Sequence, residues 1–205
     1  MNELASTPVV WQAPPPRRGL LGQWDEFIGP GATRHELLLI WLAGIGGVAG
    51  AVLYAWTREM HWSAIQWAVA VLTALDLFAG VVANATSTTK RWYHRPGRTS
   101  RHHLLFAAAH LYPFLIAWIF RSGDWLYAVL VYGYMLTAAG LIVQAPVYLK
   151  RPLAMLLFLA GLAIPWLLLA PTPGLHWLVP VLYLKILVCH LVPETPYRPT
   201  TGEEH

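Results

Sequence analysis

The chain has 205 residues, of which 57% are hydrophobic and only 12% are charged, about half the charged fraction of an average soluble domain. Its formal net charge is +4, but the basic residues lie in short segments between apolar runs, without the zinc-ligand spacing or basic–aromatic pattern of nucleic-acid-binding proteins. The single cysteine, Cys189, excludes an intrachain disulfide and a multi-cysteine metal site. We therefore expect an all-α polytopic membrane protein whose main partner is the lipid bilayer, with no nucleic-acid partner.

Residues 1–35 are predicted to be a cytoplasmic tail that ends in an amphipathic segment. Residues 1–19 are polar and rich in proline. Within 20–28, apolar residues recur at helical spacing opposite Gln23, Asp25 and Glu26. This pattern favours a short helix in the membrane interface. A surface turn packed on the bundle is the alternative.

Residues 36–192 are predicted to form a bundle of six transmembrane helices. The apolar runs cover 36–56, 64–86, 102–120, 125–143, 153–170 and 174–192. Each comes close to the roughly 20 residues that cross a bilayer core of about 30 Å. Pro165 is expected to break the fifth run. The polar residues 193–205 are predicted to be a cytoplasmic C-terminal tail.

Two local patterns shape the first span. Thr33 and Glu36 have the spacing of a capping box, which predicts that the helix begins there. Gly46 and Gly50 lie four residues apart, and small residues at this spacing allow helices to approach closely. We expect them to pack inside the chain. A face for a second copy is the alternative.

The basic residues predict the orientation. Six spans put eleven of the 14 Lys and Arg residues on one side of the membrane and only Arg58 and Arg121 on the other, while Lys185 lies within a span. Because positive residues accumulate in cytoplasmic loops, both termini are expected in the cytoplasm. The predicted location is the cell membrane, with several passes.

Polar residues within the second, third and sixth spans predict a site. One face of the second span carries Thr73, Asp76, Gly80, Asn84 and Ser87. Lipid cannot satisfy such a stripe, so it must face protein or water. His103 and His110 share a face of the third span, and Asp76 and His110 would lie at similar depths, about 12–18 Å from the cytoplasmic ends. Pro113 is expected to bend the third span beside His110.

We therefore expect a polar site in the cytoplasmic half of the bundle. The predicted catalytic residues are Asp76, His110 and Lys185, the predicted metal ligands are His103, His110 and His190, and the predicted substrate contacts are Thr73 and Asn84. His190 also lies near enough to the interface to snorkel, and His94 and His102 are expected to be solvated or to face lipid headgroups. The structural alternative is that Asp76 only neutralises Lys185 or a protonated His110.

Three functions fit this site. The first is a membrane-embedded enzyme with a metal ion or haem as cofactor, since imidazole and carboxylate are suitable ligands. The second is a proton-coupled carrier of a small solute, in which Asp76 and His110 titrate as a pair. The third is a non-catalytic accessory subunit, whose partner is another membrane protein or a second copy of the chain.

Overall fold

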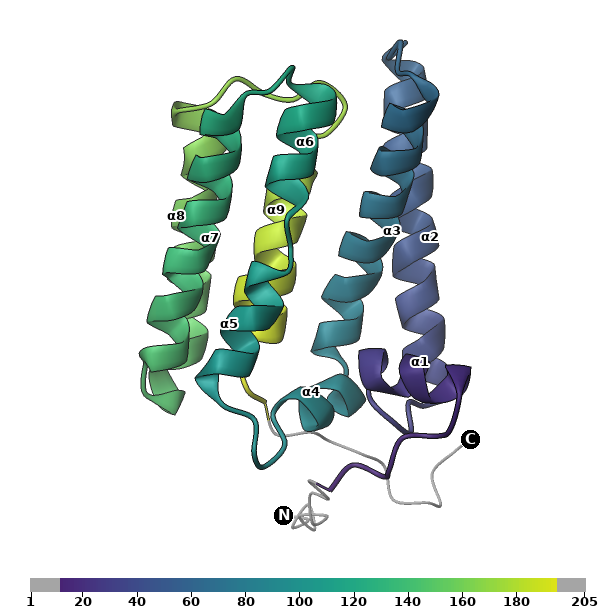
Figure 1. Cartoon of the computed structure of the whole chain (residues 1–205), viewed down its shortest axis with the longest axis vertical. Helices are drawn as coiled ribbons and strands as arrows, with labels where there is room; N and C mark the ends of the chain where they lie inside the picture. The colour runs from purple at the N-terminus through teal and green to yellow at the C-terminus, as the bar shows by residue number, and fades with distance from the viewer. Residues whose placement is uncertain (1–11, 195–205) are drawn as a thin grey trace, which may run out of the picture.

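The computed structural model describes residues 12–194, and every regular element in that range is helical (Figure 1). The helices are α1 (Leu20–Ile28), α2 (Arg34–Thr57), α3 (Ala64–Ala85), α4 (Ser87–Tyr93), α5 (Ser100–Ala108), α6 (Tyr112–Phe120), α7 (Trp125–Gln144), α8 (Val147–Leu167), α9 (Leu178–Tyr183) and the π-helix η1 (Leu184–His190). The predicted all-α class is confirmed. Residues 1–11 and 195–205 of the predicted tails lie outside the described residues.

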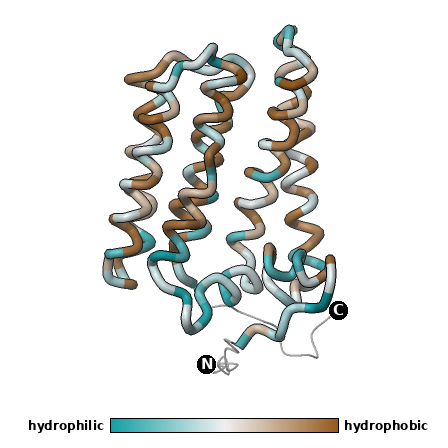
Figure 2. The backbone as a smooth tube through the Cα atoms, viewed as in Figure 1, coloured by the Kyte–Doolittle hydropathy of each residue, from teal (hydrophilic) through white to brown (hydrophobic). Residues whose placement is uncertain are grey.

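Five helical segments are long and apolar enough to cross a membrane. They are Arg34–Thr57, Ala64–Ala85, Ser100–Phe120, Trp125–Gln144 and Val147–Pro165. Hydrophobic residues run along the length of these helices (Figure 2). The last apolar stretch, Leu178–His190, is shorter. The structure therefore supports a helical membrane protein, and the sixth span stays a prediction.

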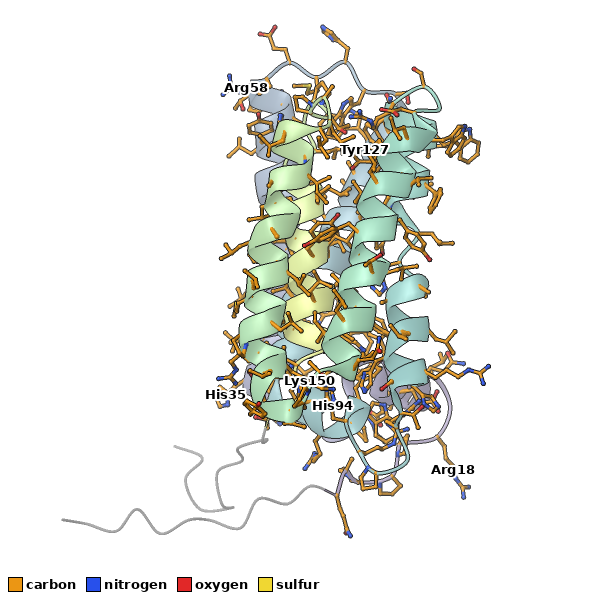
Figure 3. All side chains as sticks on the ribbon, turned by 90° about the vertical axis from the view of Figure 1, so that its left-hand side faces the viewer. Arg18, His35, Arg58, His94, Tyr127 and Lys150 are labelled. Atoms are coloured by element: carbon orange, nitrogen blue, oxygen red, sulfur yellow. The ribbon has the colours of Figure 1, made fainter. Side chains whose placement is uncertain are left out.

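The helices run between two distinct ends of the bundle. We call the end that carries α1 and α4 the basic end (Figure 1). Arg18, His35, His94 and Lys150 lie at this end, and Arg58 lies at the opposite one (Figure 3). The segments around α1 and α4, which carry most of the Lys and Arg residues, therefore lie at one end of the bundle (Figure 1).

A capping box begins α2, as predicted. The Glu36 backbone N–H donates to Thr33 Oγ1 at 3.1 Å, and the Thr33 N–H donates to Glu36 Oε2 at 2.8 Å. The same carboxylate accepts bonds from the backbone N–H of Thr88 at 3.1 Å and from its hydroxyl at 2.8 Å. Glu36 thus ties the start of α2 to the first turn of α4, where a negative charge interacts favourably with both helix dipoles.

Different glycines from those predicted bring α2 against α3. A Cβ atom on Gly44 would lie 2.9 Å from Leu75 Cδ1, and one on Gly47 would lie 2.6 Å from Phe78 Cβ. A Cβ atom on Gly46 or Gly50 would meet nothing within 4 Å. The prediction that Gly46 and Gly50 pack inside the chain is wrong. Successive residues point about 100° apart around a helix, so Gly46 faces away when Gly47 faces α3.

Helix α1 is present at the predicted residues, but its polar face is turned differently. Asp25 is buried rather than solvent-facing, and it forms an ion pair with Arg17 at 2.6 Å. Leu20 and Phe27 are exposed, at 83% and 53%. Helix α4 holds the C-terminal end of α1, because Thr89 Oγ1 donates to the Ile28 carbonyl at 2.6 Å. Its placement in a membrane interface stays a prediction.

The last two expected spans differ from their predicted form. Helix α8 begins at Val147 and continues through Pro165 to Leu167, so that proline does not break it. The final stretch becomes regular only at Leu178 and then changes from α-helix to π-helix at Leu184. π-Helical turns are uncommon and occur frequently at functional sites.

Candidate functional site: a polar pocket between α3, α5, α6 and η1

A buried ion pair joins α3 to η1. The Lys185 ammonium donates to Asp76 Oδ2 at 2.5 Å, and the Tyr112 hydroxyl donates to the same oxygen at 2.6 Å. The Lys185 side chain is 3% exposed, whereas that of Asp76 is 28% exposed. Both donors therefore occupy one carboxylate oxygen. Among residues 12–194, no group donates a hydrogen bond to the other oxygen, Oδ1.

Gly80 makes room for this ion pair. It lies one helical turn beyond Asp76, and a Cβ atom there would come 2.7 Å from Lys185 Nζ and 2.9 Å from Lys185 Cδ. The lysine side chain therefore crosses α3 over the glycine to reach the carboxylate. Lys185 itself belongs to η1, where the wider π-helical turn changes the direction in which side chains leave the backbone.

His110 lies at a break in the third predicted span. Helix α5 ends at Ala108 and α6 begins at Tyr112, one residue before Pro113, so the expected distortion is present. The His110 N–H bonds to the Ala107 carbonyl at 3.1 Å, and its Nδ1 bonds to the Phe106 carbonyl at 2.8 Å. A carbonyl only accepts, so Nδ1 carries the proton and Nε2 of the neutral ring keeps a free lone pair.

Another side chain satisfies the backbone at this break. The Tyr132 hydroxyl donates to the Ala108 carbonyl at 2.7 Å. Non-helical backbone at membrane depth is tolerated where protein groups satisfy it or where it lines a cavity. Both conditions hold here, because Ala109 and His110 line a pocket.

The pocket has a volume of about 280 Å³. Its wall is formed by Phe27, Asp76, Gly80, Ala83, Asn84, Thr89, Tyr93, Phe106, Ala109, His110, Tyr112 and Lys185. Residues from α1, α3, α4, α5, α6 and η1, together with the break, thus surround one space. Seven of these twelve residues are polar, but most of the surface that they expose to the pocket is apolar, and the ion pair lies on one part of the wall.

A second polar group, the histidine cluster, consists of His94, His103 and His190. Nδ1 of His103 lies 3.2 Å from Nε2 of His190, and Nδ1 of His190 lies 3.1 Å from Oδ1 of Asn84. The Asn84 amide donates to the Gly80 carbonyl at 2.8 Å, which fixes its orientation. Oδ1 can therefore only accept, so His190 Nδ1 is the donor.

His94 completes the cluster. Its Nε2 lies 2.9 Å from the His190 carbonyl, and its ring stacks on His103 with centroids 4.6 Å apart. The expectation that His94 is only solvated is therefore wrong. The expectation that His190 snorkels is also wrong, because that residue is buried. Their burial depends on the packing of α4 against η1, which a loop sequence does not reveal.

Phe106 separates the histidine cluster from His110. Its ring stacks on His190 with centroids 3.8 Å apart, and it packs against His110 on another side at 4.9 Å. Two of the predicted metal ligands, His103 and His190, are brought together, and His110 lines the pocket instead. Within residues 12–194, no group of three or more His, Cys, Asp or Glu is placed to hold a metal ion. The three-histidine ligand set stays a prediction.

The other predicted site residues differ in whether they line the pocket. Asp76, His110, Lys185 and Asn84 line the same pocket, and Thr73 is buried and is not among its lining residues. The sequence reasoning missed Tyr112, whose only signal was a polar-tipped aromatic next to Pro113. Whether such a hydroxyl faces a carboxylate or lipid depends on how the helix is turned.

Lys90 lies between the predicted second and third spans, yet it is buried, at 3% exposed. Its ammonium donates to the carbonyls of Cys189 and Val192, the latter at 2.5 Å. Burial lowers the pKa of Lys90 to about 8. Burial, together with the nearby His103 and Lys90, lowers the pKa of His94 to about 3. At neutral pH, Lys90 is therefore mostly charged and His94 is neutral.

In chemical terms, the pocket holds a carboxylate, an ammonium group, a phenol and an imidazole with a free lone pair. These groups can accept and return a proton and can orient a bound molecule. Lys185 and His110 are buried, and hydrogen bonds and charges act more strongly at buried positions than in bulk solvent. No protein-family model, curated protein or solved structure matches the chain, and the residues of the pocket are therefore the basis for its function.

Proposed function

We propose that the chain is a membrane-embedded enzyme that carries out acid–base chemistry in the pocket between α3, α5, α6 and η1. One observation carries the proposal: Asp76 is held through a single oxygen by Lys185 and Tyr112, and His110 lines the same pocket with its Nε2 unprotonated. A neutral imidazole whose Nδ1 is held by the Phe106 carbonyl can act as a base at Nε2, and a fixed carboxylate on the wall of the same pocket can position the substrate.

Each residue has a distinct role in this proposal. His110 accepts a proton from the substrate at Nε2. Asp76 accepts a hydrogen bond from the substrate at Oδ1, while Lys185 balances its charge and Tyr112 fixes its orientation. Asn84 contacts the substrate on the side of the basic end. A metal ion or haem at His103 and His190 is a further proposal, tested by metal analysis and an absorbance spectrum of the purified protein.

The proposal includes six passes through the cell membrane, with Leu178–His190 as the sixth and both termini in the cytoplasm. This orientation is supported by the ten Lys and Arg residues in segments at the basic end, against Arg58 and Arg121, which follow α2 and α6, at the other. The pocket then lies in the cytoplasmic half. Reporter fusions after Thr57 and Arg98 should read outside and inside. An outside reading at Arg98 would contradict this orientation.

The enzyme hypothesis is tested by turnover in liposomes. The purified protein is reconstituted and supplied with a total membrane-lipid extract and a soluble metabolite extract, and new products are followed by mass spectrometry. We expect products with the wild type and none with Asp76→Asn or His110→Gln. His102→Gln is the matched control, because His102 lies on α5 but is exposed and not part of the pocket wall. Equal products from His110→Gln and the wild type would overturn the assignment.

A proton-coupled carrier is the second candidate, and the interrupted helices favour it. The break between α5 and α6 and the π-helix η1 both border the pocket, and carriers often build substrate sites from discontinuous helices. If the chain is a carrier, a pH-sensitive dye inside the liposomes should report proton movement when solutes are added, and no new products should form. If neither turnover nor flux occurs and the chain co-purifies with one larger complex, an accessory subunit is the remaining function.

A further inference from the structure

We infer that the ligand of this pocket is an uncharged molecule with a hydroxyl head and an apolar body, of the chemical class of a long-chain alcohol. The inference rests on the proposed function, since it names the substrate class for the same pocket. It is carried by three observations: the unused acceptors, the balanced charge and the composition of the wall.

The pocket offers unused acceptors, and most of its donors are already engaged. Asp76 Oδ1 and His110 Nε2 accept no hydrogen bond from residues 12–194. By contrast, the hydroxyl groups of the wall all donate elsewhere: Tyr112 to Asp76, Thr89 to the Ile28 carbonyl and Tyr93 to the Phe27 carbonyl. Polar groups in such a site favour a ligand that completes their hydrogen bonds, so the ligand must supply a donor.

The charge of the pocket selects a neutral donor. The ammonium of Lys185 already balances the carboxylate of Asp76 at 2.5 Å. A cationic ligand would add an unbalanced charge where charges are poorly solvated, and an anionic ligand would place its negative charge against a carboxylate oxygen and a lone pair. A hydroxyl group can donate to one of the two free acceptors without adding charge.

The wall selects an apolar body. Phe27, Ala83, Phe106 and Ala109 supply carbon surface around the polar part. A volume of about 280 Å³ is at the lower limit for sites that enclose drug-sized ligands. The pocket therefore accommodates the head and first carbons of a longer chain. The exposed ring of Phe27 on α1 places apolar surface at the rim, toward the basic end.

The experiment compares four probes with the same carbon chain. Nanodiscs that contain the purified protein are titrated with radiolabelled 1-decanol, and unlabelled decylamine, decanoate and decane serve as competitors. Empty nanodiscs correct for partition into lipid. We expect saturable decanol binding that the amine, the carboxylate and the alkane displace poorly. Decylamine or decanoate binding more tightly than decanol would overturn the inference, as would the absence of saturable decanol binding.

Two variants locate the bound alcohol. His110→Phe removes the lone pair and should weaken decanol binding about tenfold, because one hydrogen bond contributes up to about 1.5 kcal/mol. Ala83→Leu leaves both acceptors in place and adds bulk at a buried position of the pocket wall, so it should abolish binding. His102→Phe should bind like the wild type. Unchanged binding in both pocket variants, with folding verified by circular dichroism, would place the alcohol elsewhere and overturn the inference.

The two proposals fail in different ways. Products that depend on Asp76 in the turnover assay, together with no decanol binding, would leave the enzyme standing and refute the ligand class. Decanol binding that depends on His110, without turnover of any extract component, would support the ligand class and refute the enzyme.

Discussion

Lys185 and Lys90 are both almost fully buried, yet the molecule neutralises them in different ways. Lys185, within the apolar stretch Leu178–His190, meets the carboxylate of Asp76. Lys90, in α4 at the basic end, donates to the backbone carbonyls of Cys189 and Val192, and among residues 12–194 no carboxylate lies within ion-pair distance of it, although the charge of Glu194 acts on it from further away. Lys185 lines a pocket, whereas Lys90 donates to carbonyl groups at the C-terminal end of η1.

Depth in the bundle accounts for this difference. Far from water, an ammonium group needs a full opposite charge, because partial charges do not compensate for its lost solvation. At the end of a helix, the terminal carbonyls already carry partial negative charge and face a cation favourably. A carboxylate counter-ion brings a second oxygen, which at Asp76 stays free to bind a ligand. A backbone carbonyl has no second oxygen that could bind a ligand. We therefore expect Lys90 to contribute to stability rather than to a binding site.

The largest expected effect comes from breaking the deep ion pair. Asp76→Asn or Lys185→Met alone should lower the free energy of unfolding by about 3–5 kcal/mol, because each leaves a buried group without its partner. The free energy of unfolding of the double variant should fall by less than the sum of the two single losses. The double variant should also be more stable than the less stable of the two single variants. Unfolding in mixed detergent and SDS measures this. Strictly additive losses would show that the two residues do not interact.

A smaller effect is expected from Gly80→Ala, which tests how Lys185 reaches Asp76. The new methyl group would lie 2.7 Å from Lys185 Nζ, so the ammonium must move away. We expect a loss of about 1–3 kcal/mol, as for other overpacked sites, although alanine favours a helix. In a Lys185→Met background the loss should shrink. Gly46→Ala is the control, because nothing lies within 4 Å of its added carbon, and it should be neutral or slightly stabilising.

Lys90→Met tests the shallow lysine and should cost less than loss of the deep pair. Removal of the ammonium leaves the carbonyls of Cys189 and Val192 without their donor, and we expect a loss of about 1–3 kcal/mol. Amide hydrogen exchange should accelerate around Leu191 while the amides of α3 near Asp76 stay protected. Faster exchange around Asp76 would show that the two lysines are not independent, and the comparison between them would fail.

The smallest effect per step is a gradual dependence of stability on pH above neutrality, at most about 1.4 kcal/mol per pH unit for a single group. Burial lowers the pKa of Lys90 to about 8, from an ordinary value of 10.5. Between these two values the unfolded chain binds more protons than the folded one, so the free energy of unfolding should rise with pH. Below about pH 8 both states are protonated, and the Lys90 contribution is constant. Lys90→Met should flatten the slope of a pH series of unfolding curves relative to the wild type. An unchanged slope would contradict the assignment.

The sequence by itself determined the positions of the long apolar helices and the residues that cannot face lipid. The capping box of Thr33 and Glu36 is a local pattern, so its geometry follows from spacing alone. Asp76, His110 and Lys185 could be grouped because charged and polar groups in apolar spans need protein partners. Matched depth on antiparallel neighbours follows from residue number, so their shared pocket was also predictable.

Only the tertiary structure decided how each helix is turned about its axis. Rotation of α2 places Gly47 rather than Gly46 against α3, and rotation of α6 brings the hydroxyl of Tyr112 to Asp76. Packing of Phe106 between His110 and His190 likewise divides histidines that the sequence grouped as ligands. These choices differ by one or two positions around a helix. An apolar span has no strong polar face to select among them, so the contacts between helices make the selection.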